Sequence, residues 1–153
     1  MSGDWSSWVI FAIIIILAFW LFSRGRRRSS SPRLQVAINM ISTVNDNLRI
    51  LERHLTDKEY TKKFKTVEWN IYKEKLEFLD EATINALNES NTIMTEFNET
   101  IESVRKSKNT ALLQGLNFEK LRDPLSRGKA GLAQWLRDNI QKELPGRGGL
   151  FGW

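Results

Sequence analysis

The first feature of the chain is an uninterrupted apolar run near its start. Every residue from Trp8 to Phe22 is apolar, in the stretch WVIFAIIIILAFWLF. As a helix, this run would be about 22 Å long, and residues 5–7 extend it to about 27 Å, close to the ~30 Å hydrocarbon core of a bilayer. The sequence therefore predicts a transmembrane anchor at residues 8–22, preceded by a short tail at residues 1–7.

The residues on either side of this run indicate a retained anchor and give its orientation. A secretory signal peptide carries positive charge before its apolar run, whereas this chain has Asp4 before the run and arginines after it. Short flanks rich in arginine stay in the cytoplasm, so we expect the N-terminus outside and the bulk of the chain in the cytoplasm. Seven residues are expected at the membrane interface, where aromatic and basic side chains gather: Trp5, Trp8, Trp20, Arg24, Arg26, Arg27 and Arg28.

A heptad pattern follows a basic, Ser/Pro-containing linker at residues 23–33. Apolar residues recur every seven positions from Leu34 to Leu55, and a second apolar residue lies three positions after each of the first three. This spacing predicts a helix over residues 34–55. Six residues are expected to form a seam that faces the core or a partner: Leu34, Ile41, Val44, Leu48, Leu51 and Leu55.

A second helix is predicted to start directly after the first. The sequence Thr56-Asp57-Lys58-Glu59 fits a capping box, in which the first and fourth residues satisfy backbone N–H groups at a helix start. With so short a joint, the two helices should form an antiparallel, coiled-coil-like hairpin within residues 34–108. The stretch TINALNESNT at residues 83–92 has low helix propensity, so we expect a bend there.

A looser connection and an amphipathic helix are expected within residues 109–144, before a Gly-rich apolar tail at residues 145–153. The helix should cover residues 130–144 and end before Pro145. Its apolar face allows two placements, either against Trp69, Tyr72 and Phe78 or on the lipid surface. The residues that would contact lipid in the second case are Leu132, Trp135, Leu136, Ile140, Leu150, Phe151 and Trp153.

Charge and composition exclude several kinds of binding and catalytic site. The net charge of +5 is unevenly distributed, because residues 56–104 are acidic while the segments on both sides are basic. A uniform nucleic-acid binder does not have this pattern. The chain has no cysteine and only one histidine, His54, which excludes thiolate chemistry and His-rich metal sites. The acidic group Glu77, Asp80 and Glu81 has no Glu-x-x-His partner of the kind used by di-iron bundles.

These patterns predict an all-α, single-span membrane protein that is not an enzyme and uses no cofactor or metal. We expect a membrane-anchored helical adaptor, or an accessory subunit of a membrane complex, that acts by helix–helix or coiled-coil binding. Its partners would be membrane lipids together with a protein partner or a second copy of the chain, and neither nucleic acid nor a small-molecule substrate. The alternative is a peripheral lipid-binding or membrane-shaping protein that uses basic amphipathic helices.

Overall fold

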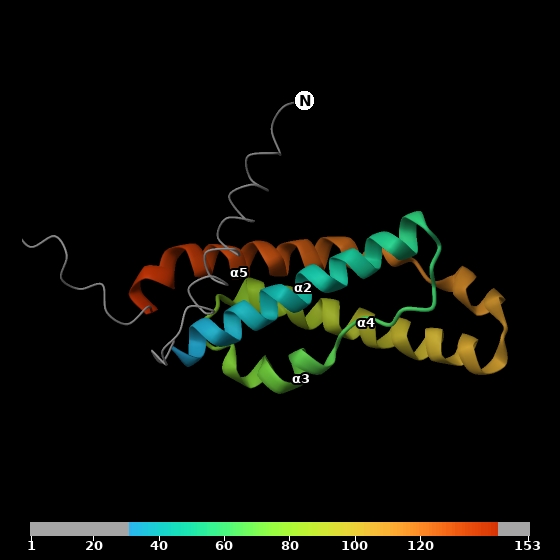
Figure 1. Cartoon of the computed structure of the whole chain (residues 1–153), viewed down its shortest axis with the longest axis horizontal. Helices are drawn as coiled ribbons and strands as arrows, with labels where there is room; N and C mark the ends of the chain where they lie inside the picture. The colour runs from blue at the N-terminus through green and yellow to red at the C-terminus, as the bar shows by residue number, and fades with distance from the viewer. Residues whose placement is uncertain (1–30, 144–153) are drawn as a thin grey trace, which may run out of the picture.

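Three long helices form the body of the protein in the computed structural model (Figure 1). The structure describes residues 31–143, except for the side chains of Gln141 and Glu143. In chain order the elements are α2 (Pro32–Thr56), α3 (Val67–Tyr72), the 3₁₀ helix η1 (Lys73–Lys75), α4 (Glu81–Ser107), the 3₁₀ helices η2 (Thr110–Gly115) and η3 (Phe118–Leu121), and α5 (Arg122–Glu143). Within residues 31–143 there is no strand, so the all-α prediction is confirmed.

The predicted transmembrane anchor lies outside the described residues, as do its seven interface residues and the tail 145–153. Among the helices of residues 31–143, none combines the length and the apolar character that crossing a bilayer requires.

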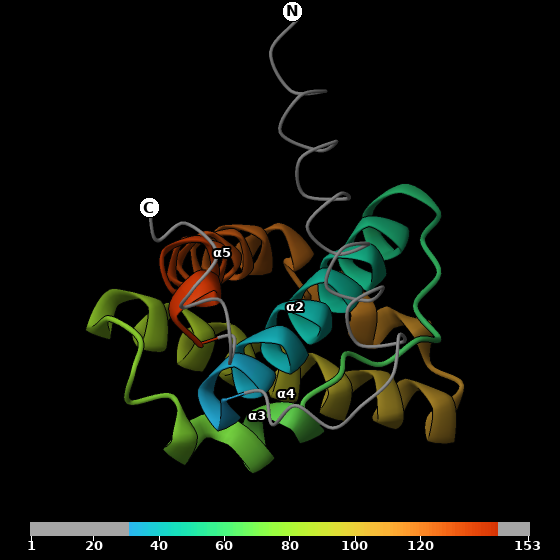
Figure 2. The same cartoon turned by 60° about the vertical axis from the view of Figure 1, so that its left-hand side comes forward.

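α5 packs along both α2 and α4 and runs antiparallel to each of them. Its start lies beside the end of α2, where Arg122 pairs with Glu52, and further along it Gly131 lies against Thr83 near the start of α4. α2 and α4 are therefore parallel to each other, and the chain between them must return along the length of the bundle. In both views α3 lies on the side of the bundle away from α5 (Figures 1 and 2).

The hairpin prediction is wrong in two respects. The capping box at Thr56 does not form, because its hydroxyl donates to the Glu52 carbonyl of its own helix at 2.7 Å. Lys58 follows with a left-handed backbone, φ 52°, and residues 57–66 are not helical. The main helical partner of α2 is α5 rather than a helix that starts at residue 57.

The predicted bend within residues 83–92 is also wrong, because α4 runs through that stretch without a break. Its start is fixed instead by Asp80, whose carboxylate accepts a hydrogen bond from the Thr83 backbone N–H at 2.8 Å. Such an N-cap satisfies a backbone donor that has no partner within the helix. Buried residues such as Leu87 and Ile93 then hold the weak helix-forming sequence in place by packing.

The last helix is longer than predicted, since α5 begins at Arg122 and includes Pro124, Gly128 and Gly131. Proline is tolerated there because it lies in the first turn. The two glycines bring α5 close to α4: an added Cβ at Gly128 would meet Leu87, and one at Gly131 would overlap Thr83. They are points of close helix contact rather than parts of a loose connection.

The predicted seam of α2 faces the core of the described bundle. Leu34, Ile41, Val44 and Leu51 are buried, while Leu48 and Leu55 are partly buried and pack against the same core. Burial of such side chains is worth roughly 1.5–3 kcal/mol each. In this structure the seam holds the bundle together and is not open to a partner.

Candidate interaction surface

Two asparagines, one on α2 and one on α4, hold the segment that returns along the bundle after α2. We call residues 62–65 the returning segment. Asn98 of α4 accepts from the Phe64 N–H at 2.7 Å and donates to the Phe64 carbonyl at 2.9 Å. Asn47 of α2 makes the same pair of bonds to Lys65, at 2.7 and 2.9 Å. A carboxamide has both a donor and an acceptor, so each side chain satisfies both backbone groups of one residue outside any helix.

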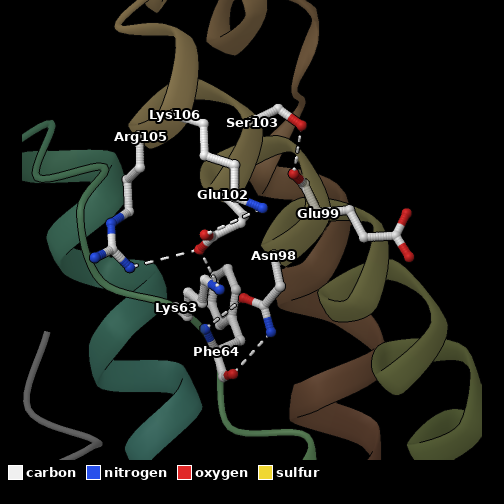
Figure 3. A network of polar contacts seen from close by, with 8 residues as sticks. All are labelled: Lys63, Phe64, Asn98, Glu99, Glu102, Ser103, Arg105 and Lys106. Atoms are coloured by element: carbon white, nitrogen blue, oxygen red, sulfur yellow. Dashed lines mark hydrogen bonds and ion pairs between the residues drawn. The ribbon is translucent and has the colours of Figure 1, made fainter.

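Ion pairs hold the same segment on either side of these asparagines. Lys63 lies 2.6 Å from Glu102 of α4, which also faces Arg105 and Lys106 (Figure 3). The hydrogen bond and charge of Lys63 are the main reason that the pKa of Glu102 lies below its ordinary value. On the α2 side, Lys65 is 2.6 Å from Asp46. These pairs are exposed, so they position the segment more than they stabilise it.

His54, in the last turn of α2, lies within a cluster of aromatic rings. It is almost fully buried, it stacks on Tyr60 and Phe118, and it is tilted against Phe64. Its Nε2 lies 2.9 Å from the Lys62 carbonyl and therefore donates to it. Burial is the largest effect on His54 and lowers its pKa below 6.5, against the opposing effects of the Lys62 carbonyl and nearby Glu59.

The free energy of unfolding should fall on mild acidification because of His54. Its pKa is lower in the folded chain than in the unfolded one, so below about pH 6.5 the unfolded state binds the extra proton more readily. Stability should be fully present above that pH and decline as the pH drops toward 5. We expect thermal unfolding, followed by circular dichroism, to show this decline in the wild-type chain and a flatter profile over the same range in His54→Phe. An equal slope in both proteins would contradict this assignment.

Because the segment is held in this way, α3 is placed on the bundle with one apolar face outward. Trp69 is buried, and Tyr72 accepts a hydrogen bond from Asn39 of α2 at 3.0 Å. Val67 and Ile71, four residues apart, point the other way and are 65% and 53% exposed. Lys73 and Lys75 follow on η1. We call Val67, Ile71, Lys73 and Lys75 the α3 strip.

The α3 strip lies close to the start of α2. A shallow cleft of about 260 Å³ is lined by Arg33 on one side and by Glu74, Lys75, Glu77 and Phe78 on the other. The second hollow, between α2, α3 and α4, measures only about 10 Å³. The chain therefore enters the bundle beside the strip.

The residues predicted to contact lipid are placed as follows. Leu132 and Leu136 are buried in the bundle, Trp135 packs on Phe78 with ring centroids 4.4 Å apart, and Ile140 is partly buried against the core. Of the two placements, α5 adopts the one against the bundle. It contacts Phe78, but Trp69 and Tyr72 lie on α3, on the side of the bundle away from α5 (Figure 1). Leu150, Phe151 and Trp153 lie outside the described residues.

The remaining candidates are structural in the described part of the chain. Asp80 caps α4 and is not paired with Glu77 or Glu81 in a metal-ligand set, and residues 31–143 contain no acidic or histidine cluster that could hold a metal. Sequence reasoning missed Asn47 and Asn98. Their only signal is an asparagine among the apolar positions of a helix, which does not reveal the distant backbone that it binds.

No protein-family model, curated protein or solved structure matches this chain.

Proposed function

We propose that the chain is a membrane-anchored helical adaptor, or an accessory subunit of a membrane complex, that binds a protein partner through the end of its bundle farthest from the membrane. The observation that supports this most is the placement of the two ends of the described chain. The start of α2 and the end of α5 lie at one end of the long axis, while the end of α4 and η2 lie at the other (Figure 1). With an anchor at residues 8–22, the second end projects away from the bilayer.

That projecting end combines apolar exposure with positive charge. Leu112 in η2 is 45% exposed, and it follows the exposed basic residues Arg105, Lys106 and Lys108 closely in the sequence. An exposed apolar side chain that follows basic residues closely in the sequence suits a partner with an acidic rim, because complementary charge speeds and orients association.

Photocrosslinking in native membranes tests this proposal on the full-length chain. A crosslinker at position 112 should give protein adducts, while one at Asn85, exposed near the start of α4, should not. Lys106→Glu with Lys108→Glu should weaken the adducts strongly, because charge reversal opposes an acidic partner. The chain should resist carbonate extraction, and protease added to inside-out vesicles should remove the bundle. Adducts that are absent at position 112, or that do not depend on the lysines, would contradict the adaptor function.

The alternative function, a peripheral lipid-binding protein, is supported by the α3 strip alone. It concerns the opposite end of the bundle, and the two functions are compatible in one chain.

A further inference from the structure

We infer that the α3 strip lies on an anionic lipid surface beside the anchor and sets the tilt of the bundle on the membrane. This inference rests on the anchor of the proposed function and adds a second point of contact. It also moves lipid contact from α5, whose Leu132 and Leu136 are buried, to a short helix with two exposed apolar residues.

An anchored bundle would keep the α3 strip close to the membrane. The linker between the predicted anchor and the start of α2, residues 23–31, spans at most about 30 Å when extended. Arg33 lines the same cleft as Lys75, and Tyr72 bonds Asn39 only two turns into α2. A bundle held by this linker therefore keeps the strip within reach of the headgroups without unfolding any described element.

The α3 strip combines positive charge with exposed apolar side chains. Between residues 62 and 75 the chain has five lysines and two glutamates. Lys63 and Lys65 are used in ion pairs with the bundle, whereas the amine of Lys75 lies over the Tyr72 ring, 5.8 Å from its centroid. Exposed apolar side chains with lysines beside them form the usual pattern of a helix that lies on an anionic membrane.

The two glutamates do not cancel this pattern. Glu68 is half-buried and faces Lys65, whose pKa it helps to raise, while Glu74 and Glu77 line the cleft together with Arg33 and Lys75. Val67 and Ile71 are therefore presented together with Lys73 and Lys75. A protein partner or the apolar tail of the chain itself could also cover this face, and the experiment distinguishes these occupants.

A depth measurement on the full-length chain provides the test. The sequence has no cysteine, so Asn70→Cys, an exposed position on α3, gives a single labelling site that leaves the strip intact. In vesicles of phosphatidylcholine with phosphatidylglycerol, a fluorophore there should be quenched by shallow spin-labelled lipids, whereas a label at Leu112→Cys, at the other end of the bundle, should not. In pure phosphatidylcholine the quenching at position 70 should be largely lost.

Two variants identify the cause of the quenching. Lys73→Gln with Lys75→Gln should lower the ratio of docked to free bundle about fivefold per lysine. Val67→Ser with Ile71→Ser should abolish docking, while the matched control Leu112→Ser should leave it unchanged. All of these side chains are exposed, so the fold should persist, and circular dichroism checks that it does.

The outcomes separate this inference from the proposed function. If the chain floats with the vesicles but the label at position 70 is not quenched, or is quenched equally in neutral lipid, the inference is overturned while the anchor stands. If the chain does not float, the anchor itself is contradicted. A photocrosslinker at Asn70 that captures protein or the chain's own tail, rather than lipid, also overturns the inference.

Discussion

Gly131→Ala is expected to destabilise the bundle by about 2 kcal/mol or more, although alanine forms helix better than glycine by about 1 kcal/mol. An added Cβ would lie 2.7 Å from the Cβ of Thr83 and would overlap its hydroxyl. Rotation of the Thr83 side chain cannot clear a contact with its own Cβ. Thr83 is also buried, and its hydroxyl bonds the Asp80 carboxylate at 2.8 Å, so α4 and α5 must move apart and disturb that cap.

Two other glycines provide graded controls in chemical denaturation. At Gly128 an added Cβ meets the flexible end of Leu87 at 2.7 Å, so Gly128→Ala should have an intermediate effect. At Gly115 it meets nothing within 4 Å, and Gly115→Ala should change stability by less than about 0.5 kcal/mol. A stabilised Gly131→Ala variant would mean that α4 and α5 are not in close contact at this point.

Asn98→Ala should cost about 2–4 kcal/mol, because it leaves both backbone groups of Phe64 without their partner, and each unsatisfied buried group costs about 1–3 kcal/mol. Phe64 is itself buried, and it contacts Phe97 and His54. Loss of the two hydrogen bonds between Asn98 and the Phe64 backbone should therefore also loosen the aromatic cluster. The free energy of unfolding and the protection of the Phe64 amide in hydrogen exchange both measure the effect.

A neighbouring asparagine supplies the matched control. Asn88 lies on the same helix, is exposed, and has no hydrogen bond from its side chain among the described residues, so Asn88→Ala should be nearly neutral. Asn98→Asp keeps the acceptor but loses the donor toward the Phe64 carbonyl, and its stability should resemble that of Asn98→Ala. An Asn98→Ala chain that melts like the Asn88→Ala control would show that segment 62–65 is not held by this side chain.

The difference between exposed Asn88 and hydrogen-bonded Asn98 also matters for glycosylation, because each of them begins a sequon, Asn88-Glu-Ser and Asn98-Glu-Thr. The carboxamide of Asn98 is occupied on both sides by Phe64, whereas that of Asn88 faces outward. In a topology experiment, only Asn88 reports on the side of the membrane without a cost to the fold.

Local periodicity was sufficient to predict α2. The apolar repeat gave a helix over residues 34–55, and the structure adds only Pro32, Arg33 and Thr56 at its ends. Proline fits the first helical turn, so the linker and the helix overlap by two residues. The all-α class follows from the same signal.

The conformation of the returning segment could not be predicted in this way. Tyr60 and Phe64 have helical spacing, but the backbone at Phe64 and Lys65 is held by Asn98 and Asn47, which are 34 and 18 residues away in the sequence. Likewise, Gly128 and Gly131 look like helix breakers in the sequence. Their use as contact points becomes clear only when α4 lies against them.

The antiparallel position of α5 has a consequence for how the chain is made. The helix that covers the apolar face of α2 is the last of the described helices to be synthesised. At 5–20 residues per second, the roughly 80 residues between Thr56 and Leu136 take about 4–16 s to add. During that interval Leu34, Ile41 and Leu51 have no α5 to cover them. The nascent chain thus presents an uncovered apolar stripe for seconds, and during that time the stripe is open to contact with other unfinished chains.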